Sequence, residues 1–93
     1  MAFFRFMAFF TYILRSQKTG RLYIGQTENV QKRLLEHNAG HTKSTSSGIP
    51  WELIFAKAVD SRLEAIALER LLKSWKNKNR VLAWVQRELE ARL

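Results

Sequence analysis

The sequence predicts an α+β fold in which helices flank a small three-stranded antiparallel sheet, in the order β-β-α-β-α-α. Three observations support this prediction. Two short apolar segments near the N-terminus flank a polar turn, a third lies in mid-chain, and the remaining apolar residues recur at helical spacing. The 93 residues suffice for one hydrophobic core, so we expect a single domain over residues 9–93 after an N-terminal extension, residues 1–8.

A β-hairpin is predicted at the start of this domain. Its arms, Phe9–Leu14 and Leu22–Ile24, are rich in aromatic and β-branched residues, and a turn-forming Lys-Thr-Gly sequence lies between them. A turn centred just after residue 17 would pair Tyr12 with Tyr23. Because directly paired residues point to the same face of a sheet, we expect the two phenols to lie side by side.

A helix over Glu28–Asn38 is predicted next. Val30 and Leu34 repeat one turn apart, and Thr27 or Asn29 is suited to cap its N-terminus.

Two polar residues of this helix, Arg33 and His37, lie one turn apart at the rim of its apolar stripe. From that rim their side chains can reach across the sheet surface that the helix covers. The segment His41–Pro50 reads as a loop because Ser, Thr and Gly cluster in it. Its hydroxyl groups beside Lys43 suit phosphate contacts, although ordinary surface loops have the same composition.

The third strand is predicted over Trp51–Val59. Strict alternation would place on one face Trp51, Leu53, Phe55 and Val59, and on the other Ile54, Ala56 and Ala58. Apolar residues on both faces indicate a strand covered on both sides.

Two helices complete the chain. The first, Ser61–Trp75, begins with a Ser-x-x-Glu capping box formed by Ser61 and Glu64. Its apolar stripe is predicted to contain Leu63, Ala67, Leu71 and Trp75, with Leu68 and Leu72 beside them. The second, about Asn79–Arg92, is expected to bury Val81, Leu82, Val85 and Leu89.

The amino-acid composition limits which partners and which kinds of site this protein can have. Sixteen Lys and Arg against eight Asp and Glu give a net charge of +8, which favours a polyanionic partner, most commonly nucleic acid. The absence of cysteine excludes disulfides and zinc–thiolate sites and suits a reducing cytoplasm. The N-terminal run MAFFRFMAFF is too short to span a bilayer and has no signal-peptide cleavage site, so we expect a cytoplasmic protein without a membrane segment.

Five polar residues are candidates for a catalytic site: Tyr12, Tyr23, Arg33, His37 and Glu69. Each alone has an ordinary explanation. Tyrosines in strands usually pack with the hydroxyl in water, Arg33 could be a solvated helix cation, and Glu69 could form an i, i+4 pair with Lys73.

Their order and spacing resemble the GIY-YIG nuclease family. Tyr23-Ile24-Gly25 matches the second half-motif literally, whereas Thr11-Tyr12-Ile13 is a degenerate form of the first. Arg33, His37 and the single Glu69 follow in the expected order, and Gly48–Trp51 and Lys73–Lys76 resemble small stand-alone bacterial members. The resemblance covers about Phe9 to Val85.

The resemblance implies metal-dependent hydrolysis of DNA phosphodiester bonds. Glu69 would hold one divalent ion, Mg²⁺ or Mn²⁺, and Arg33 would neutralise charge on the phosphate. Either Tyr12 or Tyr23 would position or deprotonate the attacking water, and His37 would accept or orient the proton of that phenol. A family asparagine after the glutamate helix has no motif-based match here, because Asn77 and Asn79 both lie in that region.

Because the chain has no room for a separate DNA-recognition domain, we expect selection of a DNA structure, such as a flap or branch, or a protein partner that supplies specificity. The expected nucleic-acid contacts are Lys32, Lys43, Lys73, Lys76 and Lys78. The main alternative is a nucleic-acid-binding module that keeps the fold but cleaves weakly or not at all. A homodimer and a protein-interaction role for the Phe-rich N-terminus are further alternatives.

Overall fold

The computed structural model describes residues 8–93. Its elements are β1 (Phe9–Ser16), β2 (Leu22–Thr27), α1 (Val30–Asn38), a 3₁₀ helix η1 (Lys43–Gly48), β3 (Trp51–Val59), α2 (Arg62–Ser74) and α3 (Lys78–Ala91). The predicted α+β class and element order are confirmed. The proposed N-terminal extension lies almost entirely outside the described residues, so its boundary stays a prediction.

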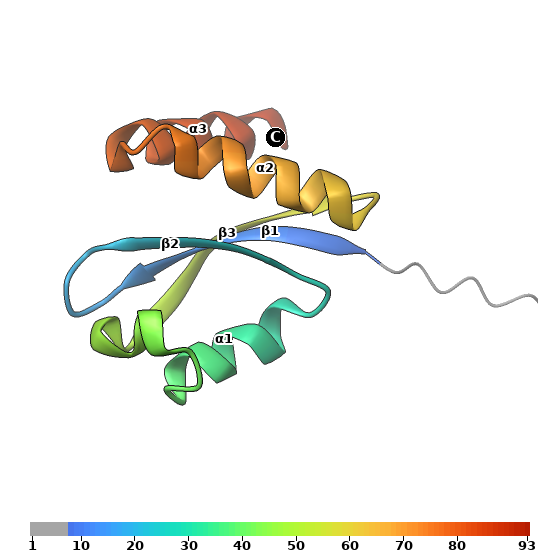
Figure 1. The fold of residues 1–93 in the computed structure, drawn as a ribbon. Coiled ribbons are helices and arrows are strands. Elements are labelled where there is room, and N and C mark those ends of the chain that lie inside the picture. Colours follow the sequence, from blue (N-terminus) through green and yellow to red (C-terminus); the bar gives the residue numbers. More distant parts are fainter. Residues whose placement is uncertain (1–7) are drawn as a thin grey trace, which may run out of the picture.

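The three strands form one antiparallel sheet in the order β2-β1-β3. Helices α2 and α3 cover one face of it, and α1 and η1 lie against the other (Figure 1). Central strand β1 is therefore covered on both faces, whereas β2 is an edge strand. Within residues 8–93, no helix is long and apolar enough to cross a membrane.

The hairpin register differs from the predicted one. Tyr12 pairs with Gly25 and Leu14 pairs with Tyr23, so the direct pairing of the two tyrosines was wrong. The slip is two residues along β2. Because the side-chain period of a strand is two, such a slip keeps both phenols on the same face.

The turn itself explains the slip. The strands end at Ser16 and resume at Leu22, and Gly20 adopts a left-handed φ of 77° that closes the turn later than expected. The Ser16 hydroxyl accepts hydrogen bonds from the N–H groups of Lys18 and Thr19 and donates to the Gly48 carbonyl at 2.6 Å. This buried hydroxyl fixes the turn and ties it to η1.

A bulge in β3 overturns the expected alternation of that strand. Ile13 pairs with Phe55 and Leu14 with Leu53, which leaves Ile54 as an extra residue. As a result, Trp51 and Leu53 pack on the α1 face, while Phe55 packs beneath α2 and α3. The prediction that these three residues share one face was therefore wrong.

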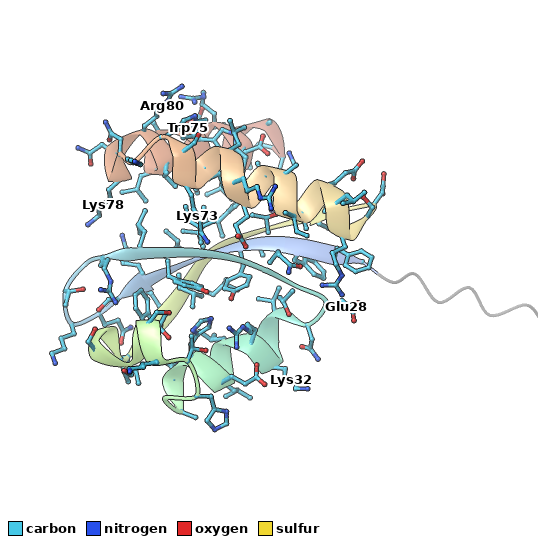
Figure 2. The ribbon with its side chains drawn as sticks, viewed as in Figure 1. Glu28, Lys32, Lys73, Trp75, Lys78 and Arg80 are labelled. Carbon is cyan, nitrogen blue, oxygen red and sulfur yellow. The ribbon has the colours of Figure 1, made fainter. Side chains whose placement is uncertain are left out.

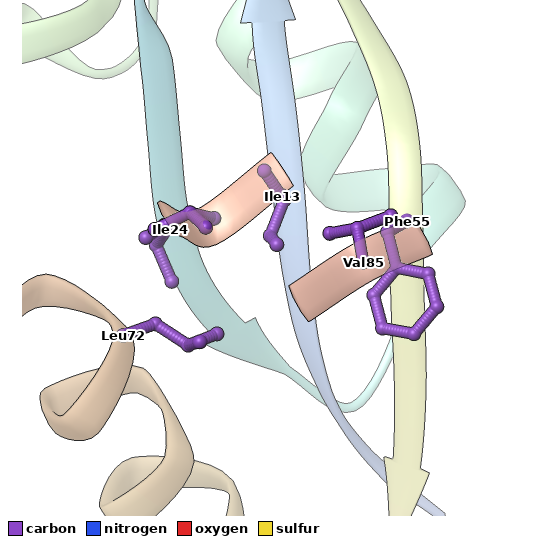
Figure 3. Packing of buried hydrophobic residues seen from close by; sticks show 6 residues of the cluster. Ile13, Ile24, Phe55, Leu72 and Val85 are labelled. Carbon is purple, nitrogen blue, oxygen red and sulfur yellow. The ribbon is translucent and has the colours of Figure 1, made fainter. Parts of the chain in front are cut away.

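The main core lies between the sheet and the helix pair α2–α3. Figure 3 shows side chains from all three strands meeting side chains from both helices, namely Ile13, Ile24, Phe55, Leu72 and Val85. A second cluster, Tyr12, Leu14 and Trp51, lies on the opposite face beneath α1. The two clusters hold α1 and α2 on either side of edge strand β2.

Helix α2 buries one side of the predicted apolar stripe, that of Leu68 and Leu72, and leaves the other side exposed. Leu63 is 78% exposed and Leu71 is 50% exposed, whereas Ala65 and Leu72 are buried and Leu68 packs beside them. Ala65 lets the helix approach the sheet closely, and its carbonyl accepts a hydrogen bond from the Thr11 hydroxyl at 2.8 Å. The Ser61 cap is confirmed, because its side chain accepts from the Glu64 N–H.

The last helix departs from prediction at two positions. Val81 and Val85 are buried as expected, but Leu82 is only partly buried and Leu89 is 42% exposed.

Leu72→Ala is expected to lower the free energy of unfolding by about 2–5 kcal/mol, because it leaves a cavity in the main core. Leu63→Ala, the same change on the same helix, should alter it by less than about 0.5 kcal/mol. Urea unfolding followed by circular dichroism measures both. Equal losses would mean that the outer face of α2 is covered as well.

Candidate active site at the edge of the sheet

The structure brings the five predicted residues together around edge strand β2. Tyr12 comes from β1, Tyr23 from β2, Arg33 and His37 from α1, and Glu69 from α2. Since α1 and α2 lie on opposite faces of the sheet, their side chains can meet only by passing the edge of β2 (Figure 1).

Gly25 makes room for the first tyrosine. It pairs with Tyr12 across the strands, and a Cβ at this glycine would lie 2.5 Å from the Tyr12 hydroxyl oxygen and 2.7 Å from ring atom Cζ. Because only glycine leaves this space, the phenol can lie across β2 with its hydroxyl towards α1. This close approach accounts for the glycine that follows Tyr23-Ile24.

A chain of buried hydrogen bonds leads away from Tyr12. Its hydroxyl lies 2.9 Å from His37 Nε2, and His37 Nδ1 lies 2.8 Å from Thr45 Oγ1. Thr45 Oγ1 also lies 3.2 Å from the Thr42 carbonyl, and we assign its one proton to that carbonyl, which makes Thr45 the acceptor from Nδ1–H. His37 is then the Nδ1–H tautomer, and its Nε2 accepts from the Tyr12 hydroxyl.

Burial supports the same assignment. The His37 side chain is fully buried, and burial followed by the positive charge of Arg33 lowers its pKa, so the ring is neutral at pH 7. Burial also raises the pKa of Tyr12 to about 12; Tyr23 adds to the rise, whereas Arg33 opposes it. Tyr12 is therefore a protonated donor held by His37.

Tyr23 lies in a more open environment than Tyr12. Its ring meets the His37 ring edge-on with centroids 4.8 Å apart, and the Tyr12 centroid is 6.2 Å away. The ammonium group of Lys73 lies 5.9 Å from the Tyr23 ring centroid. Tyr23 thus has a cation on one side and the buried Tyr12–His37 pair on the other.

Arg33 lines a polar cavity of about 310 Å³ beside β2, together with Lys32 and Glu36. Its Nη1 forms an ion pair with the Glu36 carboxylate at 3.3 Å. A guanidinium group has five N–H donors, so this contact leaves donors for a phosphate. Lys32 is exposed at the same cavity and adds positive charge.

Glu69 is the one carboxylate that α2 contributes next to the tyrosines. Its side chain is 20% exposed and pairs with Lys73 at 3.1 Å, as its i, i+4 spacing predicted. Its negative charge is close enough to raise the pKa of Tyr12.

The donor set around Glu69 suits a hard cation. No group of three or more His, Asp or Glu side chains that could hold a metal occurs in residues 8–93. Mg²⁺ commonly takes one or two carboxylates and fills its other positions with water and substrate phosphate. One acidic side chain at an open edge fits that pattern.

The remaining predicted lysines occupy two places. Lys43 is exposed at the start of η1. Lys73, Lys76 and Lys78 lie around the connection between α2 and α3, and Figure 2 shows Lys73 pointing from α2 towards the sheet and Lys78 towards the hairpin turn. The neighbouring Asn77 caps α3 by accepting from the Arg80 N–H.

Two residues of the site were not identified from the sequence. Glu36 could have been read from its i, i+3 spacing to Arg33. Thr45 carries no local signal, because its importance depends on η1 folding back against α1.

Comparison with known proteins gives the family. The GIY-YIG catalytic domain matches residues 8–81. A UPF0213 protein of Bacillus licheniformis is 39% identical over 80 residues, which cover 83% of this chain and 81% of the relative. UPF0213 proteins of Streptococcus pyogenes serotypes M5 and M3 are each 37% identical over 65 residues, covering 69% of this chain and 71% of each relative. No solved structure shows significant similarity. The chain therefore belongs to the GIY-YIG catalytic domain family, a family of nucleases.

Proposed function

We propose that this protein is a metal-dependent endonuclease that hydrolyses DNA phosphodiester bonds and selects its substrate by structure. The observation that carries the proposal is the meeting of Tyr23, Arg33 and Glu69 at one exposed sheet edge, beside a buried and fully hydrogen-bonded Tyr12–His37 pair. The net charge of +8 favours a polyanionic substrate.

Arg33 acts on the scissile phosphate. Its planar, permanently charged fork donates to phosphate oxygens and stabilises the charge that develops on them. The ion pair with Glu36 holds the guanidinium at the mouth of the polar cavity before substrate arrives.

Glu69 would hold one divalent cation, Mg²⁺ or Mn²⁺, which when bound neutralises charge on the phosphate and leaving oxygens. In the structure the Glu69 carboxylate forms an ion pair with Lys73, whose Nζ lies 3.1 Å from Oε2. An exposed ion pair of this kind is worth little, so it yields readily to a stronger ligand.

Tyr23 orients the attacking water. Tyr12 is unsuited to that task, because its hydroxyl is buried, its pKa is raised to about 12 and its proton is donated to His37. Tyr12 and His37 instead act as positioning residues that support the Tyr23 ring through aromatic contacts on the same face.

The two tyrosines give a matched test of this division. Tyr23→Phe is expected to slow magnesium-dependent cleavage by about 10²–10⁴-fold at unchanged DNA affinity, because it removes the group that orients the water. Tyr12→Phe removes the donor to His37 and a hydrogen-bond partner of Arg33 but leaves the Tyr23 hydroxyl in place, so it should slow cleavage by about tenfold or less. Single-turnover cleavage of a labelled flapped DNA measures both rates. The reverse order would assign the water to Tyr12.

The alternative, a binding module without activity, has its own signature. It would bind the same DNA with a steep salt dependence, while neither wild type nor variant cleaves it in magnesium or manganese.

A further inference from the structure

A second cavity, of about 260 Å³, lies between the hairpin turn and the α2–α3 connection. Its floor is apolar: Leu22 is partly exposed there, and the core residues Ile24, Leu72 and Val81 lie directly beneath. Its rim is polar and consists of Arg21, Lys73, Lys76, Asn77 and Lys78. The Arg21 guanidinium turns away from the cavity, because it donates to the Ser44 carbonyl at 3.3 Å and lies over the Trp51 ring. Three lysines and no carboxylate therefore surround the apolar floor.

The cations of this rim are only partly neutralised within the protein. Lys73 shares its charge with Glu69, whereas Lys76 and Lys78 form no ion pair within residues 8–93. Lys78 is held against the hairpin, because its Nζ would lie 3.3 Å from a Cβ placed on Gly20. Positive groups gathered without an acid repel one another and favour an anionic ligand.

Lys76 adds an independent observation. It adopts a left-handed φ of 48° just after α2, with its N–H donating to the Lys73 carbonyl at 3.2 Å. Glycine is the residue usually found at this helix-terminal position, because a side chain there is strained. The chain thus carries a lysine at the rim where glycine would be more stable.

We propose that this cavity holds one unpaired nucleotide of the bound DNA, with its base on the apolar floor and its phosphate between Lys76 and Lys78. Phosphate alone would leave the floor without a ligand, whereas a base has a flat apolar face that packs on such surfaces. The inference rests on the proposed nuclease function and names the feature of the substrate that is selected.

The cavity adjoins the candidate active site through one side chain. Lys73 lines the cavity, pairs with Glu69 at 3.1 Å and lies 5.9 Å from the Tyr23 ring centroid. A nucleotide in the cavity is therefore close to the phosphate that Arg33 and Glu69 act on. A base in a flap or overhang reaches it without the unpairing that a duplex requires.

Binding in EDTA tests the proposal without cleavage. Fluorescence anisotropy compares a single-strand flap with a fully paired duplex of equal length, for the wild type and for Lys76→Gly, Lys78→Gln and Arg87→Gln. Arg87 is exposed on α3 away from the cavity, so its variant controls for the loss of one charge. Wild type should prefer the flap by about tenfold, within the range that one base contact contributes.

Lys76→Gly and Lys78→Gln should each remove most of this preference, while Arg87→Gln keeps it. Lys76→Gly should also keep or raise the melting temperature, because glycine relieves the left-handed strain, so its lost affinity cannot come from unfolding. Equal binding of flap and duplex by wild type, or equal losses for both DNAs in the lysine variants, would overturn the proposal.

The outcome for the cavity is separable from that for hydrolysis. If Lys76→Gly loses the flap preference but the wild type does not cleave DNA in magnesium, the nucleotide-binding proposal is supported and the proposed nuclease function is contradicted. If the wild type binds and cleaves flap and duplex equally well, the nuclease function is supported and the nucleotide-binding role of the cavity is contradicted.

Discussion

Glu69→Ala is expected to reduce magnesium-dependent DNA cleavage by at least about 10³-fold. Glu69 is the only carboxylate that α2 places beside the tyrosines, and in the proposed site its removal would leave the divalent ion without this protein ligand. Binding to DNA should stay the same or tighten slightly, because a negative charge is lost from a basic surface. Single-turnover cleavage and anisotropy binding give the two numbers.

Stability separates this role from a structural one. Glu69 contributes an exposed i, i+4 pair with Lys73, which is worth about 0.3–0.5 kcal/mol, so the melting temperature should hardly change. Glu90→Ala on the exposed face of α3 is the matched control and should cleave like wild type. A large loss of stability with cleavage intact would make Glu69 a structural residue.

Gly25→Ala is expected to reduce cleavage strongly and also to destabilise the fold by about 1–3 kcal/mol. The added Cβ would overlap the Tyr12 hydroxyl at 2.5 Å, and the Tyr12 ring is only 1% exposed and has no space to move into. Displacing it breaks the hydrogen bond to His37 and shifts the aromatic support of Tyr23. Single-turnover cleavage and urea unfolding measure the two effects.

Gly40→Ala is a useful contrast. Gly40 has a left-handed φ of 80°, but a Cβ there would meet nothing closer than 3.9 Å. Its alanine variant should lose about 1 kcal/mol through backbone strain and keep its cleavage rate. If both glycine variants cleaved equally well, the space above Tyr12 would have no role in the site.

Much of the fold follows from the sequence because local signals agree with one another. The apolar arms of the hairpin, the Ser61 cap and the periodicity of the helices each specify an element independently. The tyrosine spacing also placed both phenols on one face. That prediction survived a wrong register, because the error was two residues and a strand repeats every two.

The errors arose where a tertiary contact decided between two local solutions. Helix α2 has two apolar stripes, and the one containing Leu63 and Leu71 looks as good in sequence as the one containing Leu68 and Leu72. Ala65 decides between them, because its small side chain permits contact with the sheet at Thr11. The β3 bulge likewise has no signal in the strand itself.

The sequence predicted which candidate residues the fold brings together, but not their individual roles. Tyr12, Tyr23, Arg33, His37 and Glu69 follow the order of the GIY-YIG nuclease family, and the fold draws them together at β2. The division between a buried tyrosine and an open one depends on Gly25, the register and the hydrogen bond to His37. None of these is visible from residue type, which is why the sequence left the two tyrosines equivalent.

The most direct test is incubation of the purified protein with linear, nicked, flapped and branched DNAs of equal length, in magnesium and in EDTA. The proposed site predicts magnesium-dependent cuts, fastest in the flapped or branched DNA, and no cuts in EDTA or with Glu69→Ala. Folded wild-type protein that binds these DNAs but cuts none of them in magnesium or manganese would contradict the assignment of the β2 edge as a nuclease site.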